Sequence, residues 1–149
     1  MDLLKLLTRG TVYECGIEDT YERAVSKLPS GFREEQLVPD PDGVLCLTYA
    51  NVELHVFQGR VNNLVVKLAG MQAALTTDDG TSIPFDSSCS LDQIVSTLHA
   101  LQVPWRVHSE HCLDQVIELI TAGSASLEFV ARGGHVRLNR IHVTEGESF

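Results

Sequence analysis

The sequence is poor in positive charge and in aromatic residues, and it has no long hydrophobic run. Its 149 residues include 11 lysines and arginines against 20 aspartates and glutamates, for a formal net charge of −9. Because a nucleic-acid-binding surface requires clustered basic side chains, we expect no nucleic-acid partner. A transmembrane helix needs about 18 or more consecutive apolar residues, and no segment approaches this length, so we predict no membrane association either.

The first ten residues lack the features of a secretory signal. Their apolar run is interrupted by Lys5, and neither a basic leader nor a small-residue cleavage site accompanies it. We therefore expect a cytoplasmic protein, in which the four cysteines are reduced.

Motifs of the common enzyme classes are also missing. There is no Cys-x-x-Cys, no Gly-x-Ser-x-Gly, and Gly133-Gly134 lies between expected strands, unlike a phosphate-binding loop. We predict no catalytic residues and no cofactor. Four cysteines and six histidines leave a Cys–His nucleophile pair open. The corresponding alternative function is a small-molecule sensor or hydrolase with a pocket between the two halves of the chain.

One histidine-rich segment could supply metal ligands. In His108-Ser109-Glu110-His111-Cys112, the two histidines can lie on one side of a helical turn, with a cysteine and a glutamate beside them. The zincin spacing is His-Glu-x-x-His, however, and no second ligand pair stands at a fixed spacing. We interpret the segment as a polar loop and predict no metal ligands.

Alternating apolar residues predict two antiparallel meanders. Within Leu45–Leu68, three apolar runs are separated by Ala50-Asn51 and by Gln58-Gly59-Arg60. A similar pattern returns over residues 117–143, with Gly133-Gly134 as a hairpin turn.

Apolar spacing and capping residues predict three helices, over about residues 2–8, 17–28 and 91–101. Asp2 and Ser90 are suitable N-caps, and Gly10 follows the end of the first helix. The segment 32–38 is ambiguous. Trp105, the single tryptophan, follows Pro104 in an expected loop, where it either covers the core of the second half or anchors a partner.

The helix and meander recur in the same order along the chain. Corresponding residues are separated by about 74 positions, and the pairs are Ile17 and Leu91, Leu45 and Ile117, Leu54 and Leu127, and Val61 and Val136. We interpret this as a tandem duplication. The alternative is an unrelated α+β chain in which the pattern recurs by chance.

The predicted fold is therefore α+β, with two tandem helix–β-meander repeats that form one antiparallel sheet and pack their helices on one face. Residues 1–75 form the first unit with the N-terminal helix, residues 76–89 a polar linker, and residues 90–149 the second unit, within one compact domain. The other face of the sheet would stay open and suit a binding surface. The predicted partner-binding residues are Glu53, His55, Phe57, Lys67, Glu128, Arg137 and Trp105.

The segment Gly16–Pro29, followed by Tyr49 and Val52–Val61, resembles a loose bacterial motif. In that motif a Gly-Ile or Gly-Met start leads a helix that ends in Leu-Gly-x-Pro, followed by a "Tyr…Leu-x-Val/Phe-x-x-Gly-x-Val" meander. It is similar to the unit of β-lactamase-inhibitor-protein-like and outer-membrane-assembly-lipoprotein (BamE-like) proteins, and to small bacterial immunity-type proteins. The match covers roughly Gly16–Leu68, with a weaker second pass over Ser90–Val143.

Two units in one chain look more like the inhibitor protein than the lipoprotein, although the chain shows no signal peptide or lipobox. In the secreted inhibitors, disulfides join a helix start to a strand, and the resemblance would place them within the pairs Cys15/Cys46 and Cys89/Cys112. It also implies a non-catalytic immunity- or inhibitor-type protein that occludes a partner protein. Because an acidic inhibitor suits a basic target, the expected partner is a basic toxin or enzyme. A homodimer formed through sheet edges is a further hypothesis.

Overall fold

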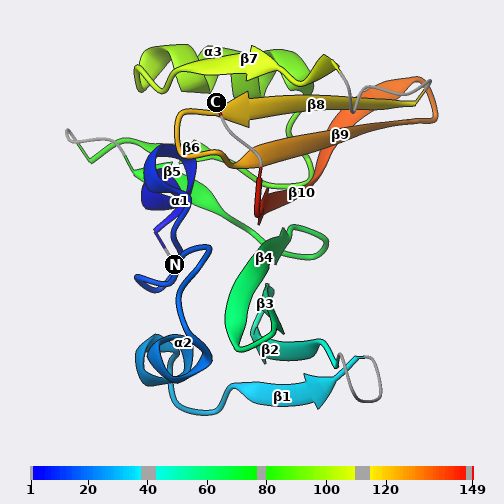
Figure 1. The fold of residues 1–149 in the computed structure, drawn as a ribbon. Coiled ribbons are helices and arrows are strands. Elements are labelled where there is room, and N and C mark those ends of the chain that lie inside the picture. Colours follow the sequence, from blue (N-terminus) through cyan, green and yellow to red (C-terminus); the bar gives the residue numbers. More distant parts are fainter. Residues whose placement is uncertain (1, 38–42, 77–79, 110–114, 147–148) are drawn as a thin grey trace.

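The computed structural model describes residues 2–37, 43–76, 80–109, 115–146 and 149. In this part of the chain, the fold combines three α-helices with an eight-stranded antiparallel sheet and a separate two-stranded hairpin (Figure 1). The elements in chain order are α1 (Leu3–Arg9), α2 (Tyr21–Lys27), β1 (Arg33–Gln36), β2 (Leu45–Tyr49), β3 (Val52–Phe57), β4 (Arg60–Lys67), β5 (Ala74–Thr76), β6 (Ser82–Pro84), α3 (Leu91–Ala100), β7 (Trp105–Val107), β8 (Val116–Thr121), β9 (Ser126–Arg132) and β10 (His135–Thr144).

The strands of the large sheet follow the order β1-β2-β3-β4-β10-β9-β8-β7. The first half of the chain therefore builds one side of the sheet and the second half the other, and β4 and β10 pair antiparallel at the centre. The two predicted meanders are confirmed as β2–β3–β4 and β8–β9–β10.

The two edge strands were not predicted. The ambiguous segment 32–38 contains β1, whose four residues are all exposed. The prediction that Trp105 lies in a loop was wrong, because it begins β7 and pairs with Thr121 of β8. A three-residue strand has too few residues to show alternation, so only its pairing partner reveals it.

Tight turns set the register of the hairpins at the centre of the sheet. Gln58 and Gly59 both have positive φ (49° and 75°), as do Gly133 and Gly134 (58° and 80°). Two consecutive residues with positive φ match the right-handed twist of the flanking strands, as in type I′ turns. Both predicted turns are thereby confirmed, and each joins the last two strands of its half.

Two of the three predicted helices are confirmed with their caps. The Asp2 side chain accepts a hydrogen bond from the Lys5 backbone N–H at 3.1 Å, and Gly10 ends α1 with φ 65°. Ser90 and Gln93 form a reciprocal capping box at the start of α3, which satisfies two backbone donors. The second helix begins at Tyr21, one turn later than predicted, because Thr20 caps it.

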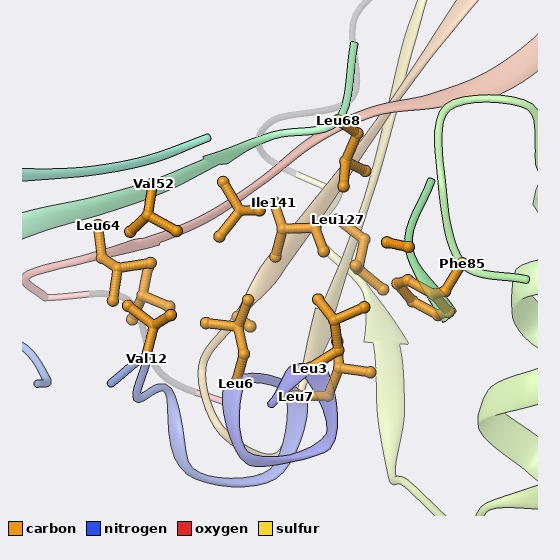
Figure 2. Close-up of a cluster of buried hydrophobic side chains, with 14 of the residues drawn as sticks. Leu3, Leu6, Leu7, Val12, Val52, Leu64, Leu68, Phe85, Leu127 and Ile141 are labelled. Carbon is orange, nitrogen blue, oxygen red and sulfur yellow. The ribbon is translucent and has the colours of Figure 1, made fainter. Parts of the chain in front are cut away.

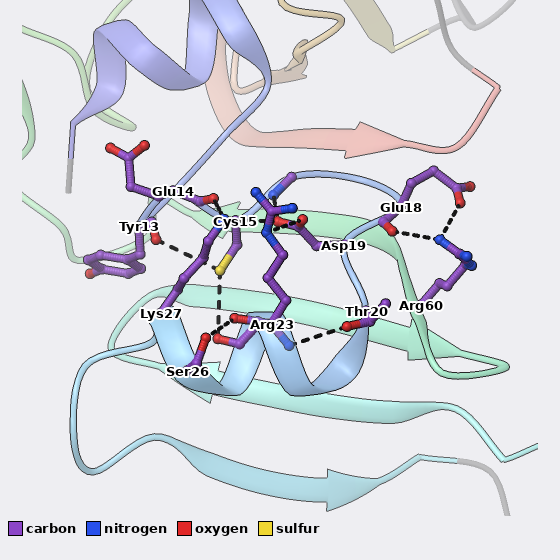
Figure 3. Close-up of polar contacts among 12 residues, drawn as sticks. Tyr13, Glu14, Cys15, Glu18, Asp19, Thr20, Arg23, Ser26, Lys27 and Arg60 are labelled. Carbon is purple, nitrogen blue, oxygen red and sulfur yellow. Dashed lines mark hydrogen bonds and ion pairs between the residues drawn. The ribbon is translucent and has the colours of Figure 1, made fainter.

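The segment before α2 is attached to the start of β4 (Figure 3). Arg60 donates to the Glu18 carbonyl oxygen at 3.0 Å, and Asp19 forms ion pairs with Arg23 at 3.0 Å and Lys27 at 3.4 Å. Thr20, the N-cap of α2, forms an isolated β-bridge with Arg60. Asp19 also accepts a hydrogen bond from the Gly16 backbone, so residues 16–19 form a turn instead of the predicted first helical turn.

One hydrophobic cluster occupies a single face of the sheet. Leu54, Leu64, Leu127 and Ile141 point into it from four strands, all with no measurable exposure. Figure 2 shows Leu3, Leu6 and Leu7 of α1 directed at these strand side chains. Burial of such side chains from water is the main stabilising contribution to a fold of this size.

The segment expected to be a polar linker contributes to this core. It contains β6, which pairs with β5, and Phe85 is fully buried against the cluster (Figure 2). Because Phe85 has mostly polar neighbours in the sequence, the composition of this segment did not predict that its side chain is buried. No helix in the described part of the chain is long and apolar enough to cross a membrane.

The end of α1 contacts the turn between β8 and β9. The Leu7 carbonyl oxygen accepts hydrogen bonds from the Gly123 backbone N–H at 3.0 Å and from the Thr121 hydroxyl at 2.6 Å. Gly10 approaches Gly123 so closely that a Cβ at either position would lie within 2.6 Å of the other residue's backbone. The N-terminal helix is thereby attached to the second half of the sheet.

Candidate functional site

The face of the sheet opposite the hydrophobic cluster carries a continuous row of side chains across all eight strands. Directly paired residues point to the same side of a sheet, and neighbours along a strand alternate. The row consists of Arg33, Thr48, Glu53, Val65, His142, Ser126, Ile120 and Arg106. None of these residues belongs to the core cluster. We call this side of the sheet the outer face.

The three helices lie on the other side of the sheet. Each of them contributes buried residues to the core cluster, as do Leu75 of β5 and Phe85 after β6. In Figure 1, α1 and α2 both lie to the left of the strands, while β1 and β8–β9 extend to the right. The outer face is therefore the side opposite these elements, but it is not open throughout. Val65, Ser126 and Ile120 in the middle of the row are buried, and only Arg33 and Arg106 at its two ends are exposed.

Charged side chains on the outer face pair with one another across the strands. Lys67 of β4 lies 2.5 Å from Glu53 of β3, and Arg140 of β10 lies 2.7 Å from Glu128 of β9. Glu53 and Glu128 are only 20% and 14% exposed, so these carboxylates lie along the sheet surface. Such pairs add little to stability, about 0–1 kcal/mol each, but they order the surface.

A buried carboxylate lies near the middle of the second half. The Glu118 side chain is 5% exposed, and its oxygens lie 3.0 Å from His142 Nε2 and 3.7 Å from His108 Nδ1. The contact between Glu118 and His142 spans β9, whose Ser126 pairs with His142 of β10 on one side and with Ile120 of β8 on the other. Burial of a carboxylate requires such compensating partners.

Cys46, Glu53 and His55 form a second polar cluster on the outer face, in the first half. Cys46 and His55 are direct partners on β2 and β3, and Glu53 precedes His55 by two residues on the same side. One potential ligand atom from each residue lies within 4.8 Å of the other two. Burial raises the pKa of the Cys46 thiol above its usual value, and the neighbouring Glu53 carboxylate adds to this, while a hydrogen bond with Thr48 lowers it.

Six of the seven residues predicted to bind a partner lie on the outer face. Glu53, His55 and Phe57 share one side of β3, and Lys67, Glu128 and Arg137 are on the same side of β4, β9 and β10. The Arg137 guanidinium donates to the Ser88 carbonyl oxygen ahead of α3.

Trp105 is separated from the other six. Its partner Thr121 faces α1, so Trp105 lies on the helix-covered side and packs against the core. Its ring makes an edge contact with His99 of α3, with centroids 5.7 Å apart. This placement agrees with a lid over the core of the second half.

Two pockets bear on the alternative of a small-molecule site. One, of about 300 Å³, lies between residues 9–17 and the second-half residues Gly123, Ser124 and 143–146, and no cysteine or histidine lines it. The other, of about 250 Å³, is lined by Val130, His135, Arg137 and their neighbours. Neither brings a cysteine and a histidine together, whereas the buried Cys46 and the half-buried His55 are direct partners on the outer face of β2 and β3.

The remaining sequence candidates are only partly described. His108 donates its backbone N–H to Glu118 at 2.9 Å, while Glu110, His111 and Cys112 lie outside the described residues. Cys15, Cys46 and Cys89 are each buried with a free thiol. The disulfide pairing of Cys15 with Cys46 that the resemblance implies is therefore not formed in this structure.

Comparison of the chain with protein-family models, with curated proteins and with solved structures found no match.

Proposed function

We propose that this chain is a non-catalytic, immunity- or inhibitor-type protein that binds a partner protein with its outer face and occludes it. The observation that carries this proposal is the group of accessible side chains on the outer face of β3 and β4, where Glu53, His55 and Phe57 are half-buried and Lys67 is exposed. A broad surface of mixed charged, polar and apolar residues is typical of protein–protein interfaces. Neither of the pockets described above holds a comparable convergence of reactive groups.

The charge distribution suggests how such a partner would be recognised. On the outer face Glu53 is paired with Lys67 and Glu128 with Arg140, and Arg33, Arg106 and Arg137 add positive charge there, so this face is not the source of the negative net charge. The net charge of −9 therefore resides mostly elsewhere on the chain. It would steer a basic toxin or enzyme toward the protein over long range, and the paired charges would set the orientation at contact.

We further propose that the outer face arose by tandem duplication of one helix–meander unit. Equivalent row positions in the two halves are Arg33 and Arg106, Thr48 and Ile120, Glu53 and Ser126, and Val65 and His142, each separated by about 72–77 positions. In addition, both helix N-caps form an isolated bridge to the final strand of their half, Thr20 with Arg60 and Ser90 with Arg137. Duplication would produce the central β4–β10 pairing by joining the two last strands.

The experiment is capture of partners from lysate of the native host, with the full chain as bait and mass spectrometry as the readout. The test variant carries His55→Ala and Phe57→Ala, two half-exposed residues of the outer face. We expect the wild type to retain one partner protein in stoichiometric amount and the variant to lose it. The melting temperatures of the wild type and the variant should be close to each other. The activity of the captured protein should rise when it is released.

The matched control carries Glu22→Ala and Asp92→Ala, both exposed near the helix N-termini on the other side of the sheet. It should retain the partner as the wild type does. Equal capture by all three proteins, or loss in the control alone, would contradict binding through the outer face.

A further inference from the structure

We infer that Cys46, Glu53 and His55 form a binding site for a divalent transition-metal ion, with zinc as the best-fitting ion. These residues supply a sulfur, an oxygen and a nitrogen atom within 4.8 Å of one another. The inference does not depend on the proposed function, because it concerns the chemistry of three side chains and not a partner protein.

The backbone places the three side chains suitably for tetrahedral coordination. Zinc bonds of roughly 2.0–2.3 Å place neighbouring ligand atoms of a tetrahedral shell roughly 3.3–3.8 Å apart. Glu53 Oε2 already lies 3.7 Å from His55 Nε2. Cys46 is the direct cross-strand partner of His55, so modest side-chain rotation brings its sulfur atom into the same shell.

Two neighbouring polar groups can orient these ligands. The Asn63 side-chain amide lies 3.4 Å from His55 Nδ1. With its oxygen turned toward the ring, it would accept a hydrogen bond from Nδ1–H and leave Nε2 free to bind a metal. The Thr144 hydroxyl lies 3.3 Å from the Asn63 side-chain amide. It can donate a hydrogen bond to the amide oxygen or accept one from the amide nitrogen, so it is compatible with both orientations of the Asn63 side chain. The Thr48 hydroxyl lies 3.5 Å from Cys46 Sγ and can donate to a thiolate there.

The charges at the site favour a cation. Glu53 places a carboxylate beside the buried Cys46 thiol, and a divalent ion would relieve the repulsion that opposes thiolate formation. On binding, the thiol proton is released to solvent and a metal–sulfur bond forms. Lys67 opposes this effect, but its ammonium group contacts Glu53 Oε1, which leaves Oε2 directed at His55.

The ligand set also restricts the choice of metal. A thiolate and an imidazole select zinc, cobalt or copper over magnesium and calcium, which prefer oxygen ligands. Three protein ligands leave one coordination position for water or an external ligand. Because Glu53 and His55 are 20% and 24% exposed, this position would be reached from the outer face.

The test is titration of the reduced, chelator-treated full chain with Co²⁺, which reports sulfur ligation by a thiolate-to-cobalt charge-transfer absorption. We expect saturation at one equivalent, displacement by Zn²⁺, and loss of the absorption in Cys46→Ser. Asn63→Leu should weaken the affinity by about 10–100-fold, since it removes an orienting group. Lys67→Met should strengthen the affinity by removing a nearby positive charge. Because this variant keeps all three ligands, it still tests the proposal if Cys46→Ser does not fold.

Two matched cysteine variants serve as controls. Cys15→Ser removes a buried thiol of the core cluster, and Cys112→Ser removes the cysteine of the histidine-rich segment. Both should keep the cobalt absorption and the wild-type affinity. Persistence of the absorption in Cys46→Ser, its loss in Cys112→Ser, or an affinity unchanged by Lys67→Met would overturn the proposal.

Discussion

Replacement of Gly123 by alanine tests how α1 is attached to the sheet. Gly123 does not have a positive φ, so alanine brings no backbone penalty there, and the whole effect is steric. The new Cβ would lie 2.5 Å from Arg9 N, 2.6 Å from Gly10 N and 2.7 Å from Thr8 C. These are backbone atoms, so no flexible side chain can turn away to relieve the contacts.

The expected loss of stability follows from the displacement this requires. Ordinary contacts of this kind are about 3.5 Å, so α1 must move by roughly 1 Å. The movement strains the bonds that Leu7 accepts from Gly123 and Thr121, worth about 1 kcal/mol each. With overpacking of about 1–3 kcal/mol, the free energy of unfolding should fall by ~3–5 kcal/mol, and the melting temperature by about 10 °C.

Urea denaturation followed by circular dichroism measures this change, and Gly59→Ala is the control. Gly59 has φ 75° and open space around it, so alanine there should cost only about 1 kcal/mol of conformational energy. If Gly123→Ala lost no more than Gly59→Ala, the close docking of α1 on the β8–β9 turn would be refuted.

Three further predictions concern the core and the thiols. Phe85→Ala should cost about 3–5 kcal/mol in urea denaturation, because this side chain is fully buried, and a loss below 1 kcal/mol would show that its segment is only a linker. Thr121→Val should cost about 1–3 kcal/mol by the same measurement, because it removes a buried hydrogen bond to Leu7, and an unchanged midpoint would contradict that bond. Burial raises the pKa values of Cys15 and Cys46 above 9.0, so the folded state binds more protons than the unfolded state once the pH exceeds this value. The free energy of unfolding should therefore be unaffected by these thiols below pH 9.0 and should fall as the pH rises further. Alkylation of both thiols should be slow below pH 9.0, and fast labelling at neutral pH would contradict their burial.

Part of the candidate site was predictable from the sequence. Alternation along residues 52–57 placed Glu53, His55 and Phe57 on the side away from the core, where the structure has them. The proximity of Cys46 to His55 was missed although the signal was present. A two-residue turn at Ala50-Asn51 pairs Tyr49 with Val52, and the same register then places residue 46 opposite residue 55.

Other features could not be read from local pattern. The position of Trp105 on the helix-covered side depends on its pairing with Thr121, which itself faces α1. The contact between His142 and Glu118 joins β10 to β8, two strands that are not paired with each other and lie on either side of β9. Propensity and periodicity contain no information about such neighbours.

The sequence by itself determined the N-caps of α1 and α3, the glycine turns and the inward or outward direction of the meander side chains. The hydrogen bonds of Asp2 and Ser90 and the positive φ values of the glycine turns involve only residues close together in the chain. A local sequence pattern is therefore enough to predict them. Only the tertiary structure decided that β4 meets β10, that Phe85 enters the core, and which outer-face charges become partners. These contacts join segments far apart in the chain. The burial of apolar surface that selects among them does not depend on how far apart two residues are in the sequence.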